Sequence, residues 1–341
     1  MIPAETGRAG ADADADAADS SDDVLVFAIP MPTRFRGIEV REGVLWRGPA
    51  GWTEWNPFWD YADVEALPWL DAADESAEHA WPEPLRTRIP VNCTVPAVGP
   101  EAAHAVVTAG HGCRTAKVKV AEPGQSLDED VARVAAVRDA LGPDGRVRVD
   151  ANGGWTLAQA RTALTELVAF DLEYVEQPCA TVAELASVRS WGIVQVAADE
   201  SIRRARDPLA VARAGAADIA VLKVSPLGGV RACLEIAERA GLPVVVSSAV
   251  DTSVGLAAGL ALAAALPDLP FACGLGTRGL LVADVVTSAA SGWPVDGELT
   301  VGRRDVDASA FDGVRADRAT TARWLERLAR VRVLQAARVS A

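Results

Sequence analysis

From about residue 89 onward, the chain alternates between short β-branched runs and longer amphipathic stretches. Eight runs have the character of strands, and in chain order they read IPVNC, TAKVKV, RVRVD, LEYVE, VQVAAD, DIAVLK, LPVVVSS and PFACG. Short apolar runs between helical stretches are typical of parallel strands that are buried on both faces. Eight of them fit a closed barrel better than an open doubly wound sheet, and no glycine-rich phosphate loop follows the first run. The sequence therefore predicts an α/β fold with a modified TIM-type (β/α) barrel.

The stretches between these runs have the pattern of helices. DEDVARVAAVRDALG and GVRACLEIAERAG are examples, and both end at a glycine. Glycine accepts the left-handed backbone that often closes a helix. We therefore expect helices that end at Gly142 and Gly241.

The segment that precedes the barrel has a different composition. VLVFAIPM and IEVREGVLWRG look like two strands joined by the polar turn PTRFRG, and helical spacing follows over 63–70. Four of the ten tryptophans lie in GWTEWNPFWDYADVEALPWL, where packing in a core or between domains explains them better than a ligand platform. A proline-rich boundary over 81–90 follows. We expect a smaller α+β capping domain at 24–88, the barrel at 89–310 and, at 311–341, a helix that packs back on the barrel or cap.

The overall charge limits the partners of the chain. The 33 Lys and Arg residues and the 47 Asp and Glu residues give a net charge of −14, which argues against nucleic acid or an anionic membrane as a partner. Residues 1–23 are small and acidic, so we expect a disordered tail there. No signal peptide is visible, and the longest apolar stretch, VGLAAGLALAAAL, is too short to span a bilayer. We expect a cytoplasmic protein, and the sequence leaves its oligomeric state open.

The cysteines indicate a reducing compartment. Their number is odd and no pair has C-x-x-C spacing, so we expect buried free thiols. They are Cys93, Cys113, Cys179, Cys233 and Cys273.

Three successive strand-like runs end in a carboxylate, at Asp150, Glu176 and Asp199. The C-terminal ends of barrel strands form the face that carries active sites. One acid in such a place caps a helix or sits in a turn, but three in succession indicate a shared site. Oxygen ligands without nearby sulfur or imidazole favour Mg²⁺, or Mn²⁺ as a substitute, over zinc. Glu200, next to Asp199, is expected to point away and to support the site from behind.

Lysines flank these acids on both sides. Lys117 and Lys119 are two residues apart on one strand, so they project to the same side, although a solvated edge strand would also accommodate them. Two adjacent ammonium groups should lower the pKa of at least one of them and leave a usable base near neutral pH. Lys223 ends the strand that follows Asp199. Its side chain could reach the other face of a substrate, or it could anchor a phosphate or carboxylate.

The series KVK (117–119), DAN (150–152), EQP (176–178), DES (199–201) and Lys223 followed by SPLGG resembles the enolase superfamily. Within it, the chain is similar to the muconate-lactonising-enzyme subgroup from about residue 24 onward. The resemblance implies a capped barrel, one Mg²⁺ on the three acids, and removal of a proton next to a substrate carboxylate. A His–Asp base would need a histidine late in the barrel, and none follows His111. The last strand reads FACGLGTRG and lacks the DxD of dipeptide epimerases.

The N-terminal segment, IPMPTRFRGIEVREGVLWRG with WTEWNPFWDY, resembles a short branch of this subgroup that acts in menaquinone synthesis. That branch implies a carbon–oxygen lyase, which performs the syn dehydration of 2-succinyl-6-hydroxy-2,4-cyclohexadiene-1-carboxylate. By resemblance, Lys119 removes the proton and then protonates the departing hydroxyl, Lys117 assists, and Lys223 stabilises the intermediate. The alternatives are an N-acylamino-acid racemase or another cycloisomerase, with Lys119 and Lys223 as opposed bases, and, least favoured, a non-catalytic barrel scaffold.

The small-molecule carboxylate substrate needs further contacts, for which the candidates are Asn152, Ser247, Ser248, Gly274 and Arg36. Ser247 and Ser248 end the seventh strand and Gly274 ends the eighth, where backbone N–H groups could reach a succinyl tail. Arg36, or Arg34, lies in the loop 33–37, which is a candidate lid. An arginine that only meets solvent is equally compatible with this loop.

Overall fold

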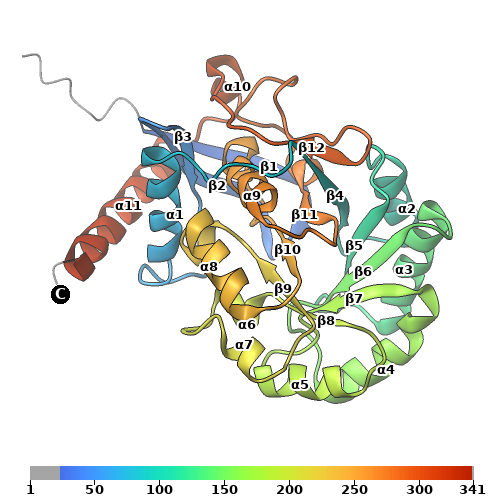
Figure 1. Cartoon of the computed structure of the whole chain (residues 1–341). Helices are drawn as coiled ribbons and strands as arrows, with labels where there is room; N and C mark the ends of the chain where they lie inside the picture. The colour runs from blue at the N-terminus through green and yellow to red at the C-terminus, as the bar shows by residue number, and fades with distance from the viewer. Residues whose placement is uncertain (1–23, 340–341) are drawn as a thin grey trace, which may run out of the picture.

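The computed structural model describes residues 24–339, so the tail predicted at 1–23 lies outside the described residues. Its larger part is a barrel of parallel strands (Figure 1). The barrel strands are β4 (Arg88–Val95), β5 (Thr115–Lys119), β6 (Arg146–Asp150), β7 (Leu172–Glu176), β8 (Val196–Ala198), β9 (Ile219–Leu222), β10 (Val244–Val246) and β11 (Cys273–Gly276). β11 pairs with β4, and a bridge between Ser247 and Gly274 joins β10 to β11. The eight predicted strands and the predicted barrel are confirmed.

Helices surround the barrel in alternation with its strands (Figure 1). They are α2 (Pro100–Thr108), α3 (Leu127–Leu141), α4 (Leu157–Leu167), α5 (Val182–Ser190), α6 (Glu200–Arg203), α7 (Ala210–Arg213), α8 (Val230–Ala240) and α9 (Ser253–Ala265), with the 3₁₀ turns η1 (Val168–Phe170), η2 (Ser225–Leu227) and η3 (Arg278–Leu280). Capping boxes at Ser126, Thr156 and Thr181 satisfy the first N–H groups of α3, α4 and α5. Gly142 and Gly241 close α3 and α8 with φ of 71° and 61°, as predicted.

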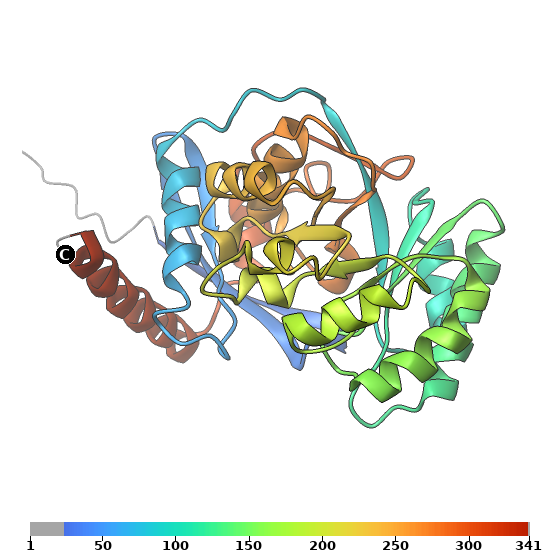
Figure 2. The same cartoon turned by 60° about the horizontal axis from the view of Figure 1, so that its bottom comes forward.

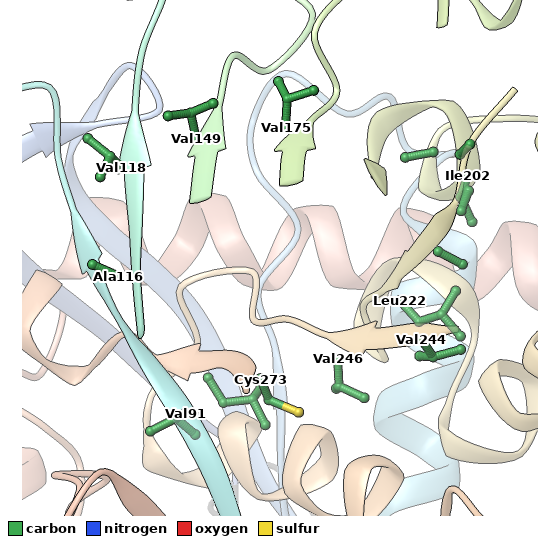
Figure 3. Packing of buried hydrophobic residues seen from close by; sticks show 14 of the residues in the cluster. Val91, Ala116, Val118, Val149, Val175, Ile202, Leu222, Val244, Val246 and Cys273 are labelled. Carbon is green, nitrogen blue, oxygen red and sulfur yellow. The ribbon is translucent and has the colours of Figure 1, made fainter. Parts of the chain in front are cut away.

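The strand alternation decides which side chains reach the barrel mouth. Val118, Val149 and Val175 are paired across β5, β6 and β7 and are fully buried (Figure 3). They belong to the main hydrophobic core, which also contains residues of α3 and α4. Residues on either side of them must therefore point into the barrel. This alternation places the lysines of β5 on the inner side.

The capping domain contains one more strand than the sequence predicts. β1 (Leu25–Phe35), β2 (Ile38–Gly48) and β3 (Gly51–Trp55) form an antiparallel sheet, and α1 (Leu67–Glu78) follows. The expected polar turn at 32–37 is shorter, because β1 continues to Phe35 and only Arg36 and Gly37 have positive φ. The expected helix at 63–70 begins at Leu67, where Pro68 fits the first turn because no N–H is needed there.

After the barrel, the chain returns to the capping domain. β12 (Glu298–Thr300) pairs with β4, α10 (Ala308–Asp312) follows, and α11 (Arg318–Val339) lies beside α1 and the β1–β3 sheet (Figure 2). The Trp324 ring meets that of Trp55 edge-on at 5.6 Å, and Arg332 donates to Asp74 at 2.5 Å. The limits 24–88, 89–310 and 311–341 stay a prediction.

Two further expectations concern the environment of the chain. The five cysteines are free and buried, as predicted. Within residues 24–339, every helix is too short or too polar to cross a bilayer.

Candidate active site

The barrel mouth brings the predicted lysines and acids together on neighbouring strands. The register pairs Lys119 with Asp150 and Asp150 with Glu176. Lys117 Nζ lies 2.8 Å from Glu176 Oε1 and 3.2 Å from Asp150 Oδ2. Lys119 Nζ lies 2.5 Å from the same oxygen of Asp150. Two lysines and two carboxylates thus form one buried cluster.

Asp199 and Lys223 complete this row at the ends of β8 and β9. Lys223 Nζ donates to Asp199 Oδ2 at 2.6 Å, and the Asp199 side chain has no exposed surface. Because β5 and β9 flank the strands that carry the acids, Lys119 and Lys223 stand on opposite sides of the three carboxylates. That a substrate between them meets one lysine on each face stays a prediction.

The charges within the cluster shift its pKa values. Burial alone lowers the pKa of Lys117, but Glu176 and Asp150 outweigh it and bring that pKa well above its ordinary value. The lowered pKa expected for at least one lysine of the pair is therefore not that of Lys117, because acids of the next two strands lie close to its ammonium group. Burial does lower the pKa of Lys223, against the opposing effect of Asp199.

The three acids have the chemistry of a site for a hard divalent cation. Their possible metal ligands are all carboxylate oxygens, which such cations prefer. The carboxylates of Asp150 and Glu176 both contact the Nζ atom of Lys117. Burial and the charge of Asp150 raise the pKa of Glu176 to about 7, as expected where carboxylates crowd together. Within residues 24–339, no three acidic, histidine or cysteine side chains already stand around a common metal position. A cation would thus take over ion pairs that the lysines now make.

A cavity lies over these residues. Barrel side chains and capping-domain side chains share its wall, and among them are Lys117, Lys119, Asn152, Lys223, Ser247, Ser248, Gly274, Phe35, Arg36, Phe58 and Trp69. Every proposed substrate contact therefore borders the cavity. Their roles in binding remain predictions.

The barrel candidates are tied into the surrounding structure. Lys119 Nζ donates to Asn152 Oδ1 at 2.5 Å. Ser248 Oγ accepts the N–H of Val250 at 2.8 Å and so holds the turn after β10. At Gly274, an added Cβ would lie 2.6 Å from Ser247 Oγ, so glycine permits the close approach of the two strand ends at this point.

The cap contributes aromatic rings as well as the predicted arginine. The Arg36 guanidinium lies 4.3 Å from the centre of the Phe58 ring, whereas Arg34 is exposed and does not line the cavity. The Phe35 ring centre lies 5.2 Å from Lys119 Nζ. Trp69 also lines the cavity, and it is packed in the core of the cap, as the preferred interpretation of the tryptophan-rich segment predicts. Sequence patterns gave no sign of which tryptophan would face the site.

Arg203 is a further residue that sequence reasoning missed. It lines the cavity, and its Nε donates to Asp199 Oδ1 at 2.9 Å. The available signal was its position, four residues after Asp199, which places the two side chains on one face of a helical turn. Glu200 is absent from the cavity wall and instead binds Asn152 and Arg203, which agrees with the expected supporting place.

A capped parallel barrel with acids and lysines at its mouth defines the class of protein. The family model described as "Enolase N-terminal domain-like" matches residues 26–77, and "Enolase C-terminal domain-like" matches residues 100–303. A solved muconate lactonizing enzyme from Pseudomonas fluorescens has the same fold, with a TM-score of 0.73 and 20% identity over 86% of this chain and 98% of that chain. The chain belongs to the enolase superfamily, in the subgroup of muconate lactonizing enzymes.

Two curated relatives are much more similar. The o-succinylbenzoate synthase of Thermobifida fusca is 61% identical over 306 residues, which cover 90% of this chain and 95% of that protein. The o-succinylbenzoate synthase of Mycobacterium tuberculosis is 54% identical over 308 residues, which cover 90% and 93%. The predicted superfamily and subgroup are thus confirmed.

Proposed function

We propose that the chain is an o-succinylbenzoate synthase, a Mg²⁺-dependent lyase of menaquinone biosynthesis that acts in the cytoplasm. It would convert 2-succinyl-6-hydroxy-2,4-cyclohexadiene-1-carboxylate to o-succinylbenzoate and water. The observation that carries the proposal is the 61% identity with the Thermobifida fusca synthase over 90% of the chain. The buried free thiols are compatible with a reducing compartment.

The charges around the cavity fit a substrate with two carboxylates. Four acids and four bases lie in the hydrogen-bonded network of the site: Asp150, Glu176, Asp199 and Glu200 with Lys117, Lys119, Lys223 and Arg203. Buried charge is costly unless it is balanced. A bound Mg²⁺ adds two positive charges, and the ring and succinyl carboxylates of this substrate would compensate positive charge in the site. The site therefore favours an anionic ligand over a neutral one.

Lys119 would move the proton in this reaction. Its Nζ would accept the proton from the ring carbon next to the carboxylate and then donate it to the hydroxyl that leaves from the same face. Water departs, a double bond forms, and the ring becomes aromatic. To act as a base, Lys119 must first lose its proton and its ion pair with Asp150. When bound, the magnesium ion would supply a positive charge to the acids and to the substrate carboxylate, where negative charge develops.

The other lysines would act through their charge. Lys223, on the far side of the acids, would face the opposite side of the substrate ring and stabilise the negative charge that spreads over it. Lys117, held between Asp150 and Glu176, would keep its proton and strengthen the positive potential at the carboxylate.

An ultraviolet assay tests this function directly. Purified protein with Mg²⁺ and the cyclohexadiene substrate should form the aromatic product, and EDTA should stop the reaction until Mg²⁺ is restored in excess. Polarimetry with N-succinyl amino acids tests the alternative, because Lys119 and Lys223 stand as two opposed bases would. Racemisation without dehydration would overturn the proposal in favour of an N-acylamino-acid racemase.

A further inference from the structure

One arginine connects the capping domain to the buried acids of the barrel. Arg203 ends the short helix α6, which begins directly after Asp199, and its side chain is 3% exposed. Its Nε donates to Asp199 Oδ1 at 2.9 Å and its Nη2 to Glu200 Oε1 at 2.5 Å. Its Nη1 donates to the hydroxyl of Tyr61, which belongs to the capping domain. Because the guanidinium is planar and rigid, three partners in different directions fix its orientation.

Arg203 determines how Asp199 is held. Both carboxylate oxygens of Asp199 are used, Oδ1 by Arg203 and Oδ2 by Lys223 Nζ at 2.6 Å. Without Arg203, a fully buried oxygen would lose its donor, and the carboxylate could turn about its own bond. The direction of the Lys223 ammonium therefore depends on the arginine.

The same arginine is also linked to the lysine on the other side of the site. Glu200 Oε1 accepts from Arg203 and from Asn152 Nδ2, the latter at 3.1 Å. Asn152 Oδ1 in turn accepts from Lys119 Nζ at 2.5 Å. A continuous hydrogen-bonded path thus joins Lys119 to Lys223, and Arg203 lies in its middle.

Tyr61 connects the cap to this path through its hydrogen bond with Arg203. It is 4% exposed, and its ring packs edge-on against Trp69, with the ring centres 5.5 Å apart. It also contacts the Phe58 ring, with centres 6.4 Å apart, and both neighbouring rings line the cavity. The tyrosine hydroxyl can therefore reach Arg203 only where the cap is docked on the barrel.

We propose that Tyr61 and Arg203 are positioning residues through which the docked cap sets the orientation of Asp199 and the relation between Lys119 and Lys223. The inference rests on the proposed function, since it assigns Asp199 to cation binding and the lysines to the reaction. It adds that the cap does more than cover the substrate. Without the Tyr61 contact, the barrel would still contain all its reacting groups, but their relative orientation would no longer be fixed.

Two variants and a matched control test the proposal. Arg203→Lys keeps the charge but cannot contact three partners, and Tyr61→Phe removes a single oxygen and keeps the ring packing. Arg204→Lys is the control, because Arg204 also binds the cap, at Asp60 (3.0 Å) and over the Tyr61 ring (4.4 Å), but contacts none of the three acids. Two measurements are made on the wild-type protein and on all three variants. The first is calorimetric titration of the substrate-free protein with Mn²⁺, and the second is the steady-state kinetics of dehydration. The unfolding midpoint serves as a check on folding.

Loss of a residue that orients a metal ligand typically costs about 10- to 100-fold. We expect Arg203→Lys to lower both Mn²⁺ affinity and kcat within that range, and Tyr61→Phe to lower both by about 10-fold, at the lower end of the range. Arg204→Lys should change neither by more than about twofold, because its contacts are partly exposed.

Equal losses in the Arg203 and Arg204 variants would overturn the proposal, because they would indicate general cap docking. Unchanged Mn²⁺ affinity in Arg203→Lys and in Tyr61→Phe, or no Mn²⁺ binding by the wild-type protein, would also overturn it. The calorimetric comparison needs no substrate. Failure of the wild-type protein to dehydrate the cyclohexadiene would therefore count against the proposed function, while the Mn²⁺ comparison would still decide the role of Arg203.

Discussion

Replacement of Arg41 by methionine should destabilise the protein through the contact between cap and barrel. Arg41 lies on β2, is 2% exposed, and donates to the half-buried carbonyl of Glu42 and to three buried backbone carbonyls. These belong to Val250 (2.9 Å), Ala249 (3.1 Å) and Asn56 (2.7 Å). Ala249 and Val250 also line the cavity. The guanidinium therefore holds a wall of the site and joins two parts of the chain.

The size of the effect follows from two opposing terms. Each buried carbonyl left without a donor costs about 2 kcal/mol, so three cost about 6 kcal/mol. Removal of the charge recovers its burial cost, which lowers the pKa of Arg41 from 12.5 to about 10 and corresponds to about 3 kcal/mol. The free energy of unfolding should therefore fall by about 3 kcal/mol.

Urea denaturation followed by tryptophan fluorescence and by circular dichroism measures this change, provided that both probes give the same transition. Arg47→Met is the matched control, because Arg47 is exposed on the same strand, and it should change the free energy by less than about 0.5 kcal/mol. Equal stability of the two variants would refute the reasoning. So would an Arg41→Met protein with an unchanged KM, since the wall formed by Ala249 and Val250 should shift.

Two further predictions concern the free energy of unfolding. Burial and Asp251 raise the pKa of Glu54 to about 7, so the folded protein holds a proton that the unfolded chain releases above about pH 4.5. Stability should therefore fall by at most about 3 kcal/mol as pH rises from about 4.5 to 7. Urea denaturation at several pH values should show a smaller fall in Glu54→Gln, and an unchanged fall would contradict the assignment. At Gly276, an added Cβ would lie 2.2 Å from the carbonyl oxygen of Asn92, so Gly276→Ala should cost at least about 2 kcal/mol. Gly279→Ala meets only ordinary contacts and serves as the control, and equal urea midpoints for the two variants would count against the close approach.

The barrel and the cluster of acids and lysines could be predicted because strand geometry is local. Side chains alternate between two faces, and the ends of parallel strands meet at one rim. The paired register of Lys119, Asp150 and Glu176 is what this geometry requires. These three residues were therefore accessible without knowledge of how the cap docks.

Contacts between the two parts of the chain were not accessible in this way. Whether Trp69 or another tryptophan faces the cavity depends on the docking of α1, which no short pattern in the sequence records. The hydrogen bond between Tyr61 and Arg203 joins residues from different domains and is equally non-local. The pKa of Lys117 is non-local for a related reason, since burial lowers it and Glu176, two strands away in the barrel, raises it.

The role of Lys119 as the base is tested most directly by kcat/KM for dehydration in Lys119→Ala and in the wild-type protein, at saturating Mg²⁺ and equal folded fraction. Positioned general acid–base groups contribute about 10²- to 10⁴-fold, and this lysine serves both proton transfers. The predicted result is a fall of at least about 10³-fold with an unchanged unfolding midpoint. A variant within about tenfold of the wild-type rate would contradict the assignment of Lys119 as the base.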